Sequence, residues 1–162
     1  MDSGGKHYSH GDATAYARKW ALGRNPRYYD FEQLGGDCTN FASQCIYAGA
    51  GVMNYRPVTG WYYLNLNSRS ASWSGVEFLY NFLIRNAGPG PYGREVSAGE
   101  VLPGDILQLG NEDGHFYHSP VIVETYPEIL VCAHSYDCLD KPLSAYSFDW
   151  VRYIHIDGVK LS

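Results

Sequence analysis

The sequence has few basic residues and no cluster of them: 12 Lys and Arg stand against 17 Asp and Glu, for a net charge of -5. Proteins that bind nucleic acid through its phosphates need the opposite balance, so nucleic acid is excluded as the main partner. No apolar run is long enough to cross a membrane, and the first residues lack the apolar stretch of a signal peptide. We therefore expect no membrane insertion, and a chain that is made and used in the cytoplasm, is released by another route, or is an excised domain.

Cysteine is also scarce, with four residues in 162 and no spacing typical of a disulfide framework. Cys38 and Cys45 fall two turns apart on one predicted helix, too far to bridge. Cys132 and Cys138 can pair only if the segment between them turns back, and the sequence leaves that open. Internal repeats and low-complexity segments are absent as well, which excludes solenoid and linker-like architectures.

The length suits one domain with a sizeable core. We expect residues 1–10, which include His7 and His10, to be a disordered N-terminal segment, and residues 11–162 to form one domain, as a monomer. Aromatic residues are abundant, with 15 Tyr and 4 Trp. Many lie among small polar residues between Tyr55 and Trp73, a pattern that suits sugar rings or extended peptides. One hypothesis is therefore a carbohydrate- or peptide-binding module that uses this segment.

Helical periodicity comes first along the chain and extended periodicity follows, which predicts an α+β fold with the cysteine helix packed on one face of a small antiparallel sheet. A turn at 126–128 should join the two middle strands as a hairpin. The predicted helices are 12–22, a cysteine helix that the Gly35-Gly36 turn opens and Gly49 and Gly51 end, and 76–86. The predicted strands are 106–109, 119–124, 129–133 and 150–156. Residues 52–75 show no clean period and are predicted to be a long loop with short turns.

The run from Gly35 to Cys45 holds the most informative residues. A glycine turn leads into Asp37, a good N-cap, and places Cys38 in the first turn of a helix. Backbone N–H groups there have no helical partner and the dipole favours negative charge, so Cys38 is predicted to lean toward the nucleophilic thiolate. Asn40, also in the first turn, either supports the site or ties down the preceding loop.

A thiolate needs a proton acceptor beside it, and His118 at the head of an apolar strand is the best candidate. The hairpin should bring His134 near His118, where it would fix the tautomer of the base. Asp137 is the competitor for that third role, and His115 is a weaker alternative base. For the oxyanion, the Cys38 N–H is the natural first donor. Candidates for the second are Gln33, Tyr28 and Tyr29.

Zinc is the alternative to a thiol mechanism. Cys132, His134, Cys138 and His118 are ligand types that zinc accepts, but their spacing is not that of a familiar zinc knuckle. The stretch 111–114 has too few alternating acidic residues for a calcium loop. We therefore predict no metal and no other cofactor.

The run Gly-Gly-Asp-Cys-Thr-Asn-Phe-Ala-Ser-Gln at 35–44 resembles the signature of the putative amidase domain family of clostridia and their relatives. Shorter matching pieces cover most of the chain in the right order, at 17–21, 25–29, 104–106, 118–119 and 133–137. That family is similar to the papain-like CHAP and NlpC cysteine hydrolases, which cut bonds in bacterial peptidoglycan. By position, the resemblance implies Cys38 as nucleophile, His118 as base and His134 as the third residue. The segment 111–115 departs from the acidic loop associated with the family.

The resemblance implies a papain-like catalytic domain over 11–162 that cleaves an amide of peptidoglycan through a thioester, as a cysteine amidase or endopeptidase acting at the bacterial cell wall. The domain would be that of a phage endolysin or a secreted wall enzyme. Which amide is cut stays open. The alternatives are the binding module described above, in which Cys38 is inert, and a cysteine protease or transglutaminase that acts on protein.

Overall fold

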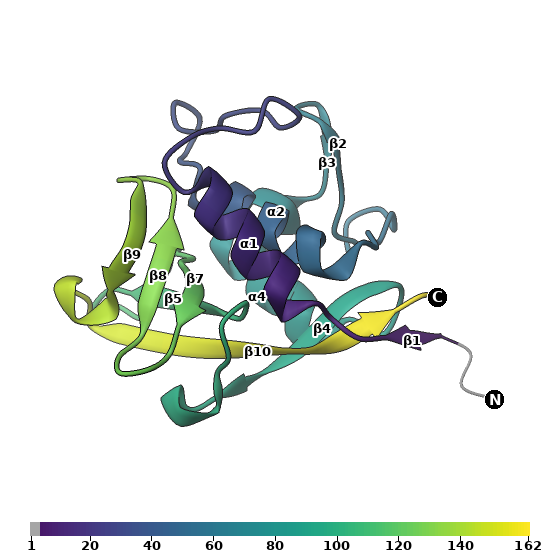
Figure 1. Ribbon diagram of the computed structural model, residues 1–162. Helices are drawn as coiled ribbons and strands as arrows, with labels where there is room; N and C mark the ends of the chain where they lie inside the picture. The colour runs from purple at the N-terminus through teal and green to yellow at the C-terminus, as the bar shows by residue number, and fades with distance from the viewer. Residues whose placement is uncertain (1–3) are drawn as a thin grey trace.

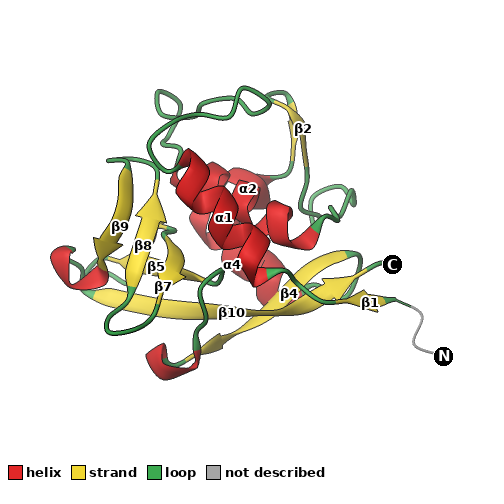
Figure 2. Cartoon of the chain, in the orientation of Figure 1, coloured by secondary structure: helices red, strands yellow, loops and turns green. Residues whose placement is uncertain are grey.

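The structure, a computed structural model, describes residues 4–162 and has an α+β fold in which helices pack against a strongly curled antiparallel sheet (Figures 1 and 2). The helices are α1 (His10–Trp20), α2 (Cys38–Ala50), the short α3 (Ala71–Ser74) and α4 (Val76–Arg85). The strands are β1 (Gly5–Lys6), β2 (Tyr63–Asn65), β3 (Ser68–Arg69), β4 (Gly90–Val96), β5 (Ile106–Gly110), β6 (Phe116–His118), β7 (Val121–Glu124), β8 (Leu130–Ala133), β9 (Cys138–Pro142) and β10 (Trp150–Lys160).

The main sheet has eight strands in the order β1-β10-β5-β7-β8-β9, with β4 paired to β10 and β6 paired to β5. Strand β10 is its longest member and runs along the base of the molecule in Figure 1. The separate hairpin β2-β3 belongs to the segment after α2. The predicted α+β class is confirmed, but the sheet is larger than expected because short strands such as β1, β6 and β9 carry little periodicity of their own.

Helix α2 is the centre of the molecule because almost all of its residues are apolar or small. Eleven of its 13 residues are buried, and α1 packs along it through Ala13 and Ala17. Burying both faces of a helix excludes water from its whole length, so α2 is a rigid base for whatever its first residue does. Among residues 4–162, none of the helices has the length and hydrophobicity that crossing a bilayer requires.

Segment 52–75 is largely irregular, as predicted, but its largest rings belong to the core. Trp61 and Trp73 are both fully buried, and their ring centroids lie 4.8 Å apart. Each indole N–H donates to α2, Trp61 to Ser43 Oγ at 3.1 Å and Trp73 to Asn40 Oδ1 at 2.9 Å. Rings held in this way cannot stack on a sugar, so these two residues do not supply the surface that a binding module would use, whereas Tyr55 of the same segment is 60% exposed.

The disordered segment predicted for 1–10 is wrong for residues 4–10. Strand β1 pairs with β10, Tyr8 is buried with its hydroxyl donating to the Gly104 carbonyl, and His10 begins α1. The Ser9 hydroxyl accepts from the Asp12 N–H and caps the helix. A two-residue strand has no sequence period, which is why the pairing was not predictable. Residues 1–3 lie outside the described residues.

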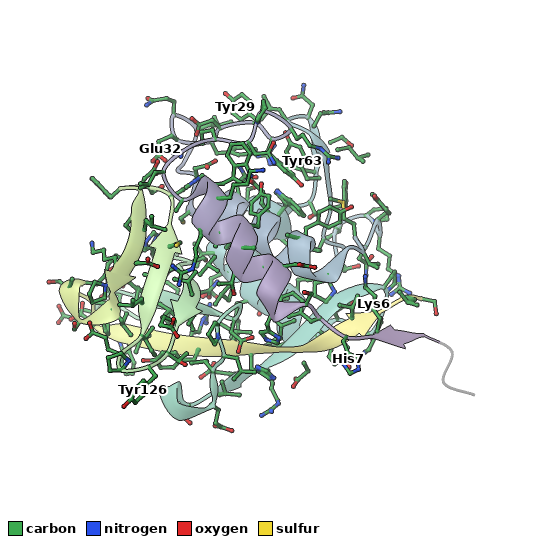
Figure 3. The ribbon with its side chains drawn as sticks, viewed as in Figure 1. Lys6, His7, Tyr29, Glu32, Tyr63 and Tyr126 are labelled. Atoms are coloured by element: carbon green, nitrogen blue, oxygen red, sulfur yellow. The ribbon has the colours of Figure 1, made fainter. Side chains whose placement is uncertain are left out.

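The hairpin of β7 and β8 is confirmed, with Val121 opposite Cys132 and the turn at Tyr126-Pro127 (Tyr126 is labelled in Figure 3). The predicted placement of His118 on the same strand is wrong. His118 ends β6, which pairs with β5 through Leu109, and Ser119-Pro120 separates it from β7. Proline cannot donate a ladder hydrogen bond, so the extended run breaks there into two strands with different neighbours.

Candidate functional site

Cys38 is the first residue of α2 and lies where the glycine turn predicted it. Gly35 and Gly36 have φ values of 90° and 99°, a region that residues with a Cβ rarely adopt, and the turn reverses the chain before the helix. Cys38 is 9% exposed. Its Sγ lies 3.7 Å from Thr39 Oγ1 and 3.9 Å from the Tyr117 carbonyl oxygen. The thiol is therefore held close to strand β6 rather than to solvent.

A pocket of about 420 Å³ opens over the thiol, lined by both Cys38 and His118. The remaining lining comes from the glycine turn, β6, the turn after β8, and β9 with the segment that follows: Gly35, Gly36, Tyr117, Ser135, Tyr136, Lys141 and Tyr146. The prediction that Cys38 and His118 share a site is in agreement with this lining. The tyrosines and Lys141 were missed, because their segments have no period that places them near residue 38.

His118 faces this pocket as a neutral imidazole. Its side chain is 8% exposed, and burial together with the nearby Lys141 ammonium lowers its pKa to about 4. Among residues 4–162 the structure gives its ring nitrogens no hydrogen-bond partner, while the Tyr146 ring lies 5.8 Å away. A neutral ring with an open nitrogen can accept a proton at any pH above about 5.

The pKa of the Cys38 thiol is shifted in the direction opposite to the predicted bias toward thiolate. Burial raises its pKa, and this outweighs the Thr39 hydroxyl and the backbone N–H groups of Thr39 and Ser119, which lower it. Burial therefore opposes the effect of the helix N-terminus on this thiol.

His134 lies behind α2, and the hydrogen bond predicted between it and His118 is not present. Its Nδ1 lies 2.5 Å from Asp37 Oδ2 and its Nε2 lies 2.9 Å from the Trp20 carbonyl oxygen. Both ring nitrogens thus have a partner that accepts hydrogen bonds. The ring also stacks on Phe41 at 4.0 Å between centroids. His134 thus connects α1, α2 and the end of β8.

Asp37 occupies the N-cap position of α2, but its side chain does not cap the helix. Fully buried, it accepts hydrogen bonds from the Phe31 N–H at 2.8 Å, from Asn40 Nδ2 at 2.9 Å and from His134. Asn40 also donates to the Tyr29 carbonyl at 2.9 Å. These contacts agree with the interpretation that Asn40 holds the preceding loop in place.

Asp137 is on the surface and does not line the pocket. It pairs with Arg24, whose NH1 lies 2.8 Å from Asp137 Oδ2. The same guanidinium lies 3.1 Å from Asp30, 3.2 Å from Glu32 and 3.5 Å from Asp37. Arg24 thereby joins the loop before the glycine turn to the segment after β8, a role that its place in the sequence did not reveal. Figure 3 shows Glu32 on this loop.

The candidates for a second oxyanion donor do not reach the thiol. Gln33, Tyr28 and Tyr29 are absent from the pocket lining. Tyr28 instead packs on Trp73, and the Tyr29 N–H donates to the Tyr63 hydroxyl at 2.7 Å, a pair that Figure 3 places together above the helices. Within the described residues, the side-chain donors that line the pocket instead include the Ser135 hydroxyl, the Lys141 ammonium and the Tyr146 hydroxyl.

A buried polar chain supports the pocket from behind. Thr39 Oγ1 lies 3.2 Å from Ser119 Oγ, and Gln108 Nε2 donates to Ser119 Oγ at 3.1 Å and to the Val76 carbonyl at 3.0 Å. Gln108 in turn accepts from Arg152 Nε at 2.8 Å. Because every member is paired, the chain fixes β5 and the Ser119 turn relative to the first turn of α2.

The alternative zinc cluster is not assembled. His134 is occupied by Asp37 and Trp20, and Cys138 Sγ lies 3.3 Å from the Tyr146 hydroxyl. Cys132 and Cys138 are both free thiols, and His115 is an exposed loop residue. Within residues 4–162, the His, Cys and carboxylate groups that converge as potential metal ligands are His10, Asp105 and His155 instead.

Residues 7–156 match the family described as "Putative amidase domain". The chain belongs to this family. It is also similar to "Uncharacterized protein YhbB" of Bacillus subtilis (strain 168), with 35% identity over 130 residues, which are 77% of this chain and 40% of that protein. The chain thus spans less than half of the relative's length. No solved structure matches. The family description points to amide hydrolysis as the chemistry of a pocket in this chain.

Proposed function

We propose that the chain is a cysteine hydrolase that cleaves an amide bond of bacterial peptidoglycan, with Cys38 as nucleophile and His118 as base. The observation that carries the proposal is that these two side chains line one pocket, at the first turn of a buried helix, in a chain of an amidase family. The glycine turn, the helix and the polar chain through Ser119 hold the thiol in place. A nucleophile and a base in one pocket are the two groups that acyl transfer requires.

The reaction would begin from the neutral pair. A substrate carbonyl enters the pocket, His118 accepts the thiol proton, and the sulfur attacks the carbonyl carbon. The N–H groups of the first turn of α2 would stabilise the oxyanion, and the Asp37 side chain does not accept from them. The imidazolium then donates its proton to the leaving amine, and a thioester remains. Water, deprotonated by His118, hydrolyses it and restores the thiol.

The rim of the pocket suits a polar substrate with both rings and negative charge. Tyr136 is 96% exposed, Tyr117 is exposed, and the Lys141 ammonium lies 3.9 Å from the centroid of the Tyr146 ring. Sugar or peptide groups can pack on such rings, and a carboxylate can pair with the ammonium. Peptidoglycan offers all of these groups. We accordingly place its action at the bacterial cell wall, as the monomeric catalytic domain of a phage endolysin or a secreted wall enzyme.

The proposal includes a papain-like fold. In its support, the nucleophile begins a buried helix that packs on an antiparallel sheet, and the base comes from a strand of that sheet. The third residue of the resemblance, His134, is assigned a different role. Because its contacts go to Asp37 and the Trp20 carbonyl, it is a positioning residue that holds the residue before Cys38.

Digestion of purified peptidoglycan tests the proposal directly. Wild-type protein should release fragments with new amino and carboxyl ends, and mass spectrometry should assign them to one type of amide, either the muramoyl–alanine bond or a peptide bond. Cys38→Ser should release none, whereas Cys45→Ser, which changes a cysteine of the same helix buried in the core, should release the same fragments. Equal release by Cys38→Ser would contradict the mechanism. Cleavage of a protein such as casein but not of peptidoglycan would favour a protease.

A further inference from the structure

Three side chains outside the pocket converge at the start of α1. His10 is the first residue of α1, Asp105 precedes β5, and His155 lies in β10. Strands β5 and β10 pair with Ile106 opposite Ile154, which brings Asp105 and His155 together at the end of that ladder. His10 Nε2 lies 2.8 Å from Asp105 Oδ1, and His155 Nδ1 lies 2.8 Å from Asp105 Oδ2.

The carboxylate at the centre is fixed by the backbone. Asp105 is fully buried, and it accepts the Ile156 N–H at 2.9 Å on Oδ1 and the Leu102 N–H at 2.8 Å on Oδ2. Two backbone N–H bonds hold the carboxylate in one orientation. It therefore presents one oxygen to each imidazole.

The two imidazoles leave one side of the cluster accessible to solvent. Their rings are nearly parallel, at an interplanar angle of 14° and 5.5 Å between centroids, and the edge of the Tyr8 ring packs on His10. The side chains of His10 and His155 are 24% and 17% exposed, in contrast to the buried Asp105. An ion can therefore reach the group from one side while the other side is closed by protein.

These three residues are a donor set of two nitrogens and one oxygen. The potential ligand atoms all lie within 4.8 Å of one another. Tetrahedral zinc with bonds of about 2.0–2.1 Å separates its ligand atoms by about 3.3 Å, so the 2.8 Å contacts need only a small widening. Two imidazoles disfavour magnesium and calcium, which prefer oxygen. The second nitrogen of His155 lies 3.7 Å from Asp157 Oδ1, where metal-binding histidines commonly have a carboxylate.

We propose that His10, Asp105 and His155 form a binding site for a divalent transition-metal ion of the zinc type, with solvent completing the coordination. On binding, each imidazole carries its proton on the nitrogen that faces away from the ion, and the two N–H···O bonds to Asp105 are replaced by metal bonds. The ion would clamp the first residue of α1 to β5 and β10. It is independent of Cys38, because the pocket of Cys38 is formed by other residues.

Zinc titration of the full chain in a Cys38→Ser background tests the site, since that change removes the pocket thiol as a competing ligand. After treatment with a chelator, calorimetry should show one zinc bound per chain and a rise in Tm, with no response to magnesium. His10→Gln and His155→Gln, which keep a hydrogen-bonding group, should each weaken zinc binding by about tenfold or more. His7→Gln, a change of an exposed histidine nearby, should leave it unchanged.

If either variant folds poorly, NMR of the histidine ring nitrogens still tests the proposed metal site. Adding zinc to the Cys38→Ser protein should shift the ring-nitrogen signals of His10 and His155 and leave those of His7 and His115 in place. The proposal is overturned if zinc does not saturate a site at millimolar concentration, if neither glutamine variant changes the affinity, or if other histidines shift instead. In those cases the cluster is a closed hydrogen-bond network.

Discussion

The two cysteines of α2 share a helix but have different surroundings. Cys38 faces a pocket together with His118 and Lys141, whereas Cys45, two turns on, is fully buried in the core and has a pKa raised well above its ordinary value by burial. Chemically the thiols are the same. What differs is access and a proton acceptor, so the start of α2 is the part of the helix at which substitutions should change the rate. Elsewhere along it they should change stability.

The largest expected effect is on Cys38 itself. Cys38→Ser should lower turnover of peptidoglycan by about a thousandfold or more, because an alcohol paired with the same imidazole is a far weaker nucleophile. Cys45→Ser should keep the rate and lower the free energy of unfolding by about 1–3 kcal/mol, because it buries a hydroxyl in apolar surroundings. Initial rates and urea denaturation of both variants measure the contrast. Equal rates for the two variants would remove the distinction between the ends of the helix.

His134 tests whether a residue outside the pocket can act on it. His134→Ala should lower the rate by about 10- to 1,000-fold and also cost about 1–3 kcal/mol of stability, since it leaves the buried Asp37 without one partner. Asp137→Ala removes only a partly exposed ion pair with Arg24 and should change stability by less than about 1 kcal/mol.

The shape of the pH–rate profile separates the two possible roles of His134. A positioning role predicts that His134→Ala lowers the plateau and leaves the pH of the acid limb unchanged, because the residue does not bond to His118. A shift of that limb, or a larger loss in Asp137→Ala than in His134→Ala, would show that one of them orients the base after all.

Thiol alkylation compares the two cysteines without a substrate. Because burial raises the pKa of Cys38, iodoacetamide should label it more slowly than a free cysteine near pH 7, and the labelling rate should climb as pH rises through 9 and beyond. Cys45 should be labelled only after unfolding. Mass spectrometry of peptides over a range of pH measures both rates. If Cys38 is labelled faster than free cysteine, the thiolate predicted from the helix N-terminus is supported instead.

The smallest effect should come from Lys141, which helps to lower the pKa of His118 to about 4. The neutral imidazole is the active form, so activity is present above that pKa and is lost as pH falls through it. Lys141→Met removes a positive charge, which raises the pKa of His118 and should move the acid limb of the rate profile to higher pH, by less than about one unit. Lys6→Met, a change on the edge strand β1, should leave the limb in place.

The sequence predicted the parts of the site that depend on local chemistry. The glycine turn, the helix at 38–50 and the turn at Tyr126-Pro127 are each determined by residue types within a few neighbouring positions. What it did not predict depends on which segments pair. His118 belongs to a three-residue strand ended by Ser119-Pro120, and this short strand, not the β7–β8 hairpin, sets its position.

Residues with several acceptable partners were the least predictable. Asp37 suits an N-cap, but tertiary contacts with the Phe31 N–H and His134 take its carboxylate instead. His10 and Asp105 are 95 residues apart, and only the folded chain brings them together. Such pairs form only when the strands lie in a particular order in the sheet. The sequence of short strands does not determine that order.

The pairing of β1 with the end of β10 has a practical consequence. The Leu161 N–H donates to the Gly4 carbonyl, so the two ends of the described chain are neighbours, at the edge of the sheet opposite β9 and its pocket residue Lys141 (Figure 1). A short peptide could join them, and new ends could be opened at the exposed Tyr126 turn, to give a circular permutant with the same catalytic groups. Tethers for immobilising the protein can likewise be attached at either end without covering the pocket.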